Sequence, residues 1–422
     1  MPGHKGKTFL GPECLDITEI DGADVLYTSD GIIEESQKNA SSLFGTKKTL
    51  YSCEGSSLSI RAMLYLAVLN SPHSKKVLAT RNVHKVFMSA AVLLDLNVEW
   101  LHSSENTVLS CKVSADILDK KLSEMDEKPI AFYITSPDYL GNVADIEALA
   151  NICHKWGILL LVDNAHGAYM NFLPVSRHPI ALGADMCCDS AHKTLPVLTG
   201  GAYLHISKNA PDSLAENAKR AMAAFASTSP SYLIMQSLDL ANKYLCDEYR
   251  NKLLKCAKRV GEVKEKLSHK GFTIVGNEEL KITVETKSFG YTGCEIADLL
   301  LENNIVCEFA DPDFLVLMIT PETSEDDLSR LEDVLLGIQK KSALTDVPPT
   351  PSMLECAMSP RDAAFSKWQT IPANEAAGKV LAVENVSCPP AIPIAVCGER
   401  LDENTVKLFK YYGINKITVV KL

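Results

Sequence analysis

The chain has 422 residues, of which 46% are hydrophobic and 23% charged, and its formal net charge is −11. This length allows a large core and more than one domain, and the composition is that of an ordinary globular protein. No stretch approaches the roughly 20 apolar residues of a membrane span, and residues 1–7 lack the apolar segment of a signal peptide. We therefore expect a cytoplasmic protein without a membrane partner, and the acidic charge argues against a nucleic-acid partner.

Thirteen cysteines occur, an odd number with irregular spacing and no C-x-x-C pair. Adjacent Cys187 and Cys188 do not suit tetrahedral metal binding. The pattern favours reduced, mostly buried thiols and predicts no metal site.

Apolar runs of strand length alternate with helical periodicity between about residues 50 and 210. The expected strands are 76–80, 130–135, 158–162 and 201–206. Between two of them, one face of a predicted helix carries Ile146, Leu149, Ala150 and Cys153. This alternation predicts an α/β fold with a mostly parallel central sheet and helices on both faces. Ligands of such sheets bind beyond the carboxyl ends of the strands.

The second half predicts a smaller α+β domain. A charged helix over 247–270 ends at Gly271, and it is followed by strands at 272–275 and 281–285, a helix at 294–303, a strand pair within 305–319 and a helix at 325–340. Residues 347–351 are a proline-rich linker to an ordered tail. The predicted division is an N-terminal segment (1–45), a large cofactor-binding domain (46–245), a small α+β domain (246–345) and a C-terminal segment (346–422).

Lys193 is the first candidate for chemistry. It is flanked by Ser190, His192 and Thr194, and hydroxyls with an imidazole can hold a phosphate while the amine attacks an aldehyde. Considered without its context, Lys193 is better interpreted as a solvated lysine.

Asp163 ends the most hydrophobic predicted strand. It is either a turn or cap residue, or a carboxylate that pairs with the protonated pyridine nitrogen of pyridoxal 5′-phosphate (PLP). His166, three residues further on, is either a group on the substrate side or a structural histidine.

Two more segments follow predicted strands. Gly55, Ser56 and Ser57 precede a helical pattern whose N-terminus favours an anion, although a plain serine N-cap is the alternative. His84 can stack on a flat heterocycle or lie on the surface, and residues 135–141 supply hydroxyls or simply a Pro/Gly turn. The convergence of these strand ends indicates a PLP site in which Lys193 forms a Schiff base.

The sequence argues against two kinds of nucleotide-binding site, a phosphate loop and a dinucleotide-binding motif. Residues 3–8 have two residues between the glycines where a phosphate loop needs four, and no strand precedes them. No G-x-G-x-x-G follows a strand, which argues against a nicotinamide dehydrogenase.

With these residues assembled, the chain resembles the Orn/Lys/Arg decarboxylase family, which belongs to the fold-type I PLP enzymes of the aspartate aminotransferase superfamily. The segments that carry the resemblance are 1–6, 16–22, 36–45, 163–167, 190–196, 389–393 and 398–399. The resemblance implies a homodimer or higher homo-oligomer with active sites at the subunit interface.

The resemblance also implies site roles. Lys193 binds PLP and Asp163 pairs with its ring nitrogen. His166 is a further catalytic candidate, selected by its position after the strand that ends at Asp163 and not by the resemblance. The other implied contacts are His84 and Ala165 on the two ring faces, and Ser56, Ser57, Ser190 and His192 at the phosphate. Asn164, Tyr169, Gly200-Gly201 and Cys397 depart from the family pattern, which leaves PLP binding intact and the substrate open.

The leading hypothesis is decarboxylation of a basic amino acid (arginine, lysine or ornithine) to a polyamine-type amine and carbon dioxide, with Lys193 or His166 returning a proton to Cα. The alternatives are an aminotransferase or another lyase on the same fold, and a catalytically inactive homologue that acts as a regulatory subunit. The choice among the three substrates, and between a biosynthetic and an acid-resistance role, stays open at this point.

Overall fold

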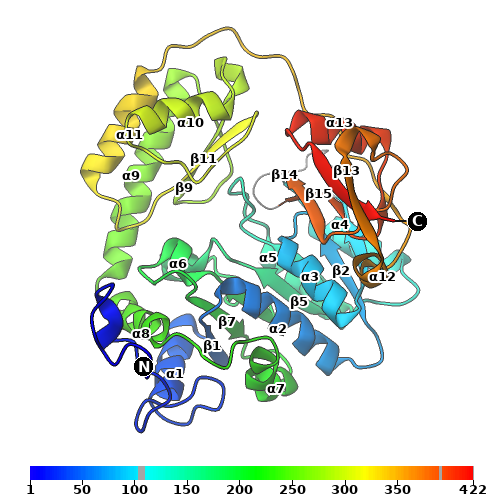
Figure 1. Cartoon of the computed structure of the whole chain (residues 1–422). Coiled ribbons are helices and arrows are strands. Elements are labelled where there is room, and N and C mark those ends of the chain that lie inside the picture. Colours follow the sequence, from blue (N-terminus) through cyan, green and yellow to red (C-terminus); the bar gives the residue numbers. More distant parts are fainter. Residues whose placement is uncertain (103–109, 389–391, 422) are drawn as a thin grey trace. The chain divides into compact units, whose positions relative to one another are not determined.

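The computed structural model describes residues 1–102, 110–388 and 392–421 (Figure 1). The chain forms two compact units, each assembled from separated stretches. The first unit contains Met1–Leu78, Ser114–Ser136 and Asp145–Asn251, and the second contains Ala79–Val113, Pro137–Ala144 and Lys252–Leu422. The four-segment division expected from the sequence stays a prediction.

The first unit consists mainly of sheet strands and the helices that cover them. Its strands are β1 (Lys48–Ser52), β2 (Lys76–Thr80), β4 (Ala131–Thr135), β5 (Leu159–Asp163), β6 (Met186–Asp189) and β7 (Ala202–Ile206). Its helices are η1 (Pro12–Cys14), α1 (Ile32–Phe44), α2 (Gly55–Asn70), α4 (Ala115–Glu124), α5 (Ile146–Lys155), η2 (Ala168–Phe172), α6 (Ala191–Thr194), α7 (Asp212–Ala223) and α8 (Tyr232–Asp247).

The large sheet has the strand order β1-β7-β6-β5-β4-β2-β3, where β3 is Asn97–Leu101. Strand β5 pairs in parallel with β4 and β6, whereas β7 is antiparallel to both β6 and β1. Every residue of β5 is buried, as expected for a strand covered on both faces. Helix α2 lies across β1, β7, β6 and β5 (Figure 1). The predicted α/β sheet is confirmed.

The register of the parallel strands brings their carboxyl ends together. Thr135 at the end of β4 is paired with Asp163 at the end of β5, and Asp163 is paired with Cys188 of β6. The next residues, Asn164 and Ser190, therefore begin two neighbouring turns at the same edge of the sheet.

The second unit contains the smaller sheets. Its first elements are α3 (Lys85–Leu94), β3, α9 (Tyr249–Lys270, which begins in the first unit), β8 (Thr273–Val275), β9 (Lys281–Glu285), η3 (Lys287–Phe289), α10 (Gly293–Glu302), β10 (Phe309–Ala310), β11 (Phe314–Met318) and α11 (Glu325–Gly337). Strands β10-β11-β9-β8 form an antiparallel sheet. Helix α11 ends at Gly337 rather than at the predicted Lys340, because Ile338 is already extended.

The described part of the tail forms regular elements, as predicted. Residues 389–391 of the proline motif lie outside the described residues. The elements of the tail are β12 (Glu355–Cys356), α12 (Pro360–Phe365), β13 (Trp368–Pro372), η4 (Ala373–Glu375), β14 (Asn385–Cys388), β15 (Ile392–Val396), β16 (Glu399–Arg400), α13 (Glu403–Tyr411) and β17 (Lys416–Val420). They pair as three two-stranded sheets, β12-β16, β13-β17 and β14-β15.

A bidentate ion pair joins the tail to a much earlier part of the second unit. Both terminal nitrogens of Arg81 donate to the carboxylate of Glu399, each at 2.7 Å. Glu399 Oε2 also accepts from the backbone of Val396 at 2.9 Å, and the Arg81 guanidinium lies 4.9 Å from the centre of the Trp100 ring. Because Glu399 is buried, this pair depends on all of these donors being present.

No helix in the described part of the chain has the length and apolarity needed to cross a membrane. The cysteines whose surroundings are described carry free thiols.

Candidate active site

Lys193 lies in α6, directly after β6, and is partly buried. Its Nζ is 2.9 Å from Nε2 of His166, which lies in the turn after β5 and is 6% exposed. The alternative of a solvated surface lysine does not fit this environment. The structure therefore brings together the two residues for which the sequence predicts proton transfer.

Asp163 is the last residue of β5, and its side chain is almost completely buried, with 2% exposed. Its Oδ1 accepts from the backbone of Ala165 at 3.2 Å and from the Cys188 thiol at 3.6 Å, and its Oδ2 accepts from the Tyr133 hydroxyl at 3.2 Å. Asp163 thus caps a turn, as one interpretation of the sequence proposed, and also presents a buried carboxylate at the sheet edge.

Tyr133 and Cys188 keep their protons. Burial, reinforced by the negative charge of Asp163, raises the pKa of the Tyr133 hydroxyl and that of the Cys188 thiol well above their ordinary values. Both groups therefore act as donors to Asp163. The sequence did not indicate either residue, although Tyr133 points to the same side of β4 as Thr135 because the side chains of a strand alternate.

The start of α2 offers donors to an anion. Ser56 and Ser57 lie within the first turn of the helix, so the alternative of a serine N-cap is wrong: the N-cap is Glu54, whose side chain makes no capping bond. Glu54 instead accepts from the backbone of Ser227 at 2.6 Å. The first backbone N–H groups of a helix lack partners within it and favour an anion.

Ser190 and His192 lie beside this helix start. The Ser190 hydroxyl donates to the Ser56 hydroxyl at 2.8 Å. Nδ1 of His192 is 3.0 Å from the carbonyl oxygen of Gly201. Because a carbonyl oxygen only accepts hydrogen bonds, Nδ1 of His192 carries a proton and donates it to Gly201.

The pair Gly200-Gly201, a departure from the family pattern, shapes the same turn. The Gly55 N–H at the start of α2 donates to the Gly200 carbonyl at 2.7 Å. Gly200 has a φ of +97°, and a Cβ there would lie 2.8 Å from the carbonyl oxygen of Cys53. A side chain at either glycine is excluded by close approach, since a Cβ at Gly201 would meet Val197 at 2.2 Å.

We expect Gly200→Ala to destabilise the protein by about 2–3 kcal/mol, because it combines a strained φ with a backbone collision. Thermal unfolding measures the effect. Gly157→Ala is the matched control: its φ of +69° is similarly left-handed, but no heavy atom lies within 4 Å of the added Cβ. Its cost is expected to be about 1 kcal/mol. Equal melting temperatures for the two variants would contradict the proposed collision with Cys53.

His84 belongs to the second unit and is the N-cap of α3, where its Nδ1 accepts from the backbone of Val86 at 3.3 Å. It is partly buried rather than fully on the surface. Its stacking on a cofactor ring stays a prediction. The segment after β4 forms a turn in which the Gly141 N–H donates to the Asp138 carbonyl at 3.0 Å, which agrees with the alternative of a Pro/Gly turn.

The residues of the first unit fit PLP. Lys193 supplies an amine, Asp163 a buried carboxylate for a protonated ring nitrogen, and the start of α2 uncapped N–H groups beside the Ser56 and Ser190 hydroxyls. A Cβ at Gly55 would meet no heavy atom within 4 Å, so the phosphate end of this site has open space. An amine, an anion site and a buried carboxylate are the three groups that PLP requires.

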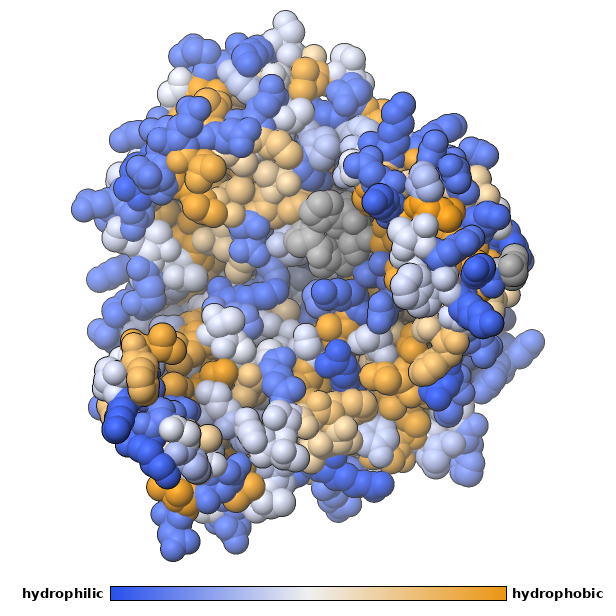
Figure 2. Space-filling model, viewed as in Figure 1, coloured by the Kyte–Doolittle hydropathy of each residue, from blue (hydrophilic) through white to orange (hydrophobic). Residues whose placement is uncertain are grey.

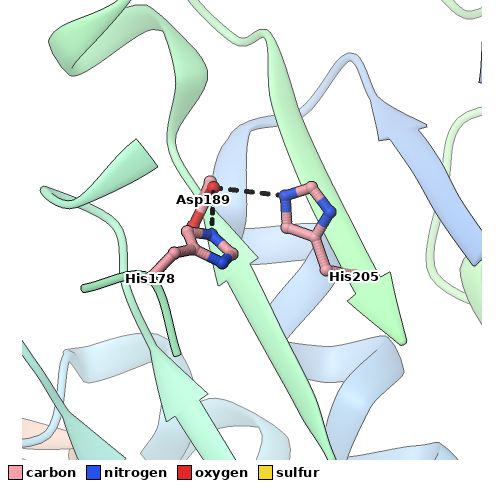
Figure 3. Close-up of side chains that lie close together, drawn as sticks. All are labelled: His178, Asp189 and His205. Carbon is pink, nitrogen blue, oxygen red and sulfur yellow. Dashed lines mark hydrogen bonds and ion pairs between the residues drawn. The ribbon is translucent and has the colours of Figure 1, made fainter. Parts of the chain in front are cut away.

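Behind this edge lies a cluster that the sequence did not indicate. His178, Asp189 and His205 are completely buried, and both histidines point their Nε2 atoms at one carboxylate oxygen of Asp189, at 3.0 and 3.1 Å (Figure 3). No periodic or spacing pattern connects these three residues.

The fold and the site together define a PLP-dependent enzyme of fold type I. Residues 3–284 match the major domain of the Orn/Lys/Arg decarboxylases, and residues 343–418 match their C-terminal domain. The chain belongs to the Orn/Lys/Arg decarboxylase family, and it is an amino-acid decarboxylase that uses PLP.

Curated relatives and solved structures agree with this membership. The chain is 29% identical over 445 residues to the arginine decarboxylase of Bacillus subtilis (strain 168), covering 97% of this chain and 89% of that protein. It is 28% identical to the arginine decarboxylase of Halalkalibacterium halodurans, and the match covers 96% of this chain and 88% of that protein. Its fold is similar to that of lysine decarboxylase A from Pseudomonas aeruginosa, with a TM-score of 0.83 and 16% identity over 100% of this chain and 78% of that one. It is also similar to that of the E. coli constitutive lysine decarboxylase, with a TM-score of 0.81 and 17% identity over 100% of this chain and 79% of that one.

Proposed function

We propose that this enzyme removes the α-carboxylate of arginine to give the corresponding amine and carbon dioxide. Family membership supports a basic amino acid, and four of the relatives that match almost the whole chain are named arginine decarboxylases. The observation that carries the chemistry is the contact of Lys193 Nζ with His166 Nε2 at 2.9 Å, beside the buried carboxylate of Asp163. An aminotransferase on the same fold is not favoured.

PLP, when bound, accepts the electron pair that the broken Cα–carboxylate bond leaves behind. Asp163 would hold the protonated ring nitrogen, and the donors Tyr133, Cys188 and the Ala165 N–H keep its carboxylate in one orientation. Preorganised charge of this kind needs no rearrangement during the reaction.

Lys193 and His166 handle the proton. Nζ of Lys193 would hold the cofactor covalently, and as a free amine it can carry a proton. At 2.9 Å the amine and the imidazole can exchange a proton, so either group can protonate Cα after carbon dioxide has left. Ser56, Ser57, Ser190 and His192 are proposed to hold the phosphate, with Ala165 on one ring face.

We also propose that the enzyme is a homodimer in the cytoplasm. The N-terminal segment, dark blue in Figure 1, exposes Phe9, Leu10, Leu15 and Ile20 and contributes a hydrophobic area to the face in Figure 2. Apolar side chains gathered in one exposed segment mark an interaction surface. The free thiols support a reducing compartment.

The test is incubation of the PLP-loaded protein with arginine, lysine, ornithine and an uncharged amino acid. Carbon dioxide and the amine product are measured together. We expect arginine to give the highest kcat/KM and a one-to-one yield of the two products. Transfer of the amino group to a keto acid without amine formation would contradict decarboxylation, and a preference for lysine or ornithine would contradict the substrate alone.

A further inference from the structure

The cluster of His178, Asp189 and His205 extends beyond these three side chains. Asp189 Oδ2 accepts from Nε2 of both histidines, and Asp189 Oδ1 accepts from the side-chain amide of Asn164 at 2.7 Å. On the far side of His205, Nδ1 lies 2.8 Å from the Thr49 hydroxyl. All of these residues belong to the first unit and to the sheet or its adjoining turns.

The charge of the cluster follows from its surroundings. Burial alone would raise the pKa of Asp189, but His178 and His205 lower it, and the net result is a pKa well below the ordinary value. Burial lowers the pKa of His205 despite the nearby Asp189. Asp189 is therefore a carboxylate and His205 a neutral ring, whose Nε2–H donates to Asp189 while Nδ1 accepts from Thr49. Asp189 is therefore a buried carboxylate stabilised by donated hydrogen bonds.

Asp189 and Asn164 connect the two turns that carry the site. Asn164 follows Asp163 and lies two residues before His166; its own N–H donates to the Cys188 carbonyl at 3.0 Å, and its carbonyl accepts from the Gly167 N–H at 2.8 Å. Asp189 is followed directly by Ser190 and by the helix that carries Lys193. The hydrogen bond between Asn164 and Asp189 therefore joins the turn of His166 to the turn of Lys193.

The identity of residue 164 matters for this hydrogen bond. Residue 164 is an asparagine, and its side-chain amide is the group that donates to Asp189. A carboxylate at position 164 would face the carboxylate of Asp189 in a site without solvent, and two like charges in contact are strongly unfavourable. Only a donor such as an amide complements Asp189.

We propose that Asp189 is a positioning residue for the cofactor site and that its hydrogen bond with Asn164 sets the distance between Lys193 and His166. The proposal rests on the proposed function, since it assigns Asp189 a purpose in holding the residues that bind PLP. The side-chain atoms of His178, Asp189 and His205 also lie within 4.8 Å of one another, which is a spacing that a metal ion accepts. The hydrogen-bond distances favour N–H donors over a metal, and metal binding is an outcome of the test.

The test is an exchange of the two side chains. Asn164→Asp alone places two carboxylates together, and we expect it to raise the dissociation constant for PLP at least about tenfold and to change the absorption spectrum of the bound cofactor. Asp189→Asn alone is also expected to weaken PLP binding, because one amide oxygen replaces two acceptors while Asn164, His178 and His205 all donate to this side chain. The double variant, which combines Asn164→Asp with Asp189→Asn, again pairs one amide with one carboxylate. It is expected to restore PLP affinity to within about threefold of the wild type.

Asp185→Asn is the matched control. Asp185 is a buried aspartate at the opposite end of β6, where it accepts from the Leu160 N–H at 2.8 Å and from His154 at 3.1 Å. Its loss is expected to lower the melting temperature without changing the PLP spectrum. A spectrum changed as much by Asp185→Asn as by Asn164→Asp would show a general loss of stability and would overturn the proposal.

Different measurements test the proposed function and the Asn164–Asp189 hydrogen bond. Decarboxylation by the wild type tests the proposed function, whereas the melting temperatures of the four cofactor-free proteins test the Asn164–Asp189 pair without any catalysis. If Asn164→Asp does not fold, folding of the double variant supports the proposal. Failure of the double variant to improve on Asn164→Asp would overturn it, as would one equivalent of Zn²⁺ bound by the wild type and lost in Asp189→Asn.

Discussion

Replacement of Lys193 by alanine is expected to reduce decarboxylation by at least about 10³-fold, because it removes both the covalent attachment of PLP and an amine that moves a proton to Cα. His166 lies 2.9 Å from the lost amine and would then face a space where Nζ was. Carbon dioxide release and the visible absorption of the PLP-loaded protein measure the two effects. Mass spectrometry after borohydride reduction should locate the cofactor on the wild-type peptide that contains Lys193.

Lys208→Ala is the control for the Lys193 variant. Lys208 is an exposed lysine just beyond β7 in the same unit, and its loss should leave turnover and absorption unchanged. A Lys193→Ala protein that keeps the absorption of covalently bound PLP, or that retains more than about a tenth of the wild-type turnover, would contradict the assignment of Lys193.

Asp163→Asn is expected to lower kcat by about 10²-fold or more with a smaller change in KM, because the neutral amide no longer stabilises a positive charge on the pyridine ring. The substitution keeps the size of the side chain, but Tyr133 and Cys188 donate to different oxygens of Asp163, so only one of them keeps its acceptor. A thermal unfolding curve should accompany the kinetics. Steady-state kinetics and the absorption spectrum of the loaded protein provide the measurement.

Tyr133→Phe gives a graded comparison for the Asp163 variant. It removes one donor at 3.2 Å from Oδ2 and leaves the carboxylate charged, so its effect on kcat should stay below about tenfold. An Asp163→Asn enzyme that is as active as Tyr133→Phe would show that the charge at position 163 is not used in the reaction.

The sequence predicted the parts of the fold that local patterns encode. Strand β2 has the predicted bounds, and β5 differs by one residue, because uninterrupted apolar runs between turn signals define buried strands. Strand β6 escaped prediction, since Met186–Asp189 is short and contains no β-branched residue. The antiparallel direction of β7 was not predicted either, because a completely buried strand has no alternation from which a direction or face can be inferred.

The residues of the candidate site also fall into two groups, those that the sequence predicted and those that it did not. Lys193, Asp163, Ser56 and Ser190 follow strand ends or start helices, so motifs and topology were enough to select them. The partners Tyr133, Cys188 and Asp189 are set by the register between neighbouring strands, which no single segment records. The same reason hid His178 and His205, whose common partner lies on a third segment.

The ion pair between Arg81 and Glu399 has a consequence for the order in which the protein is made. The two residues are 318 positions apart. They lie in the first and last of the three stretches that form the second unit, Ala79–Val113 and Lys252–Leu422. Arg81 is synthesised long before Glu399, so its guanidinium has no carboxylate partner until residue 399 has been added. A nascent chain stalled before that point would leave the second unit incomplete, and incomplete units of this kind are prone to aggregation.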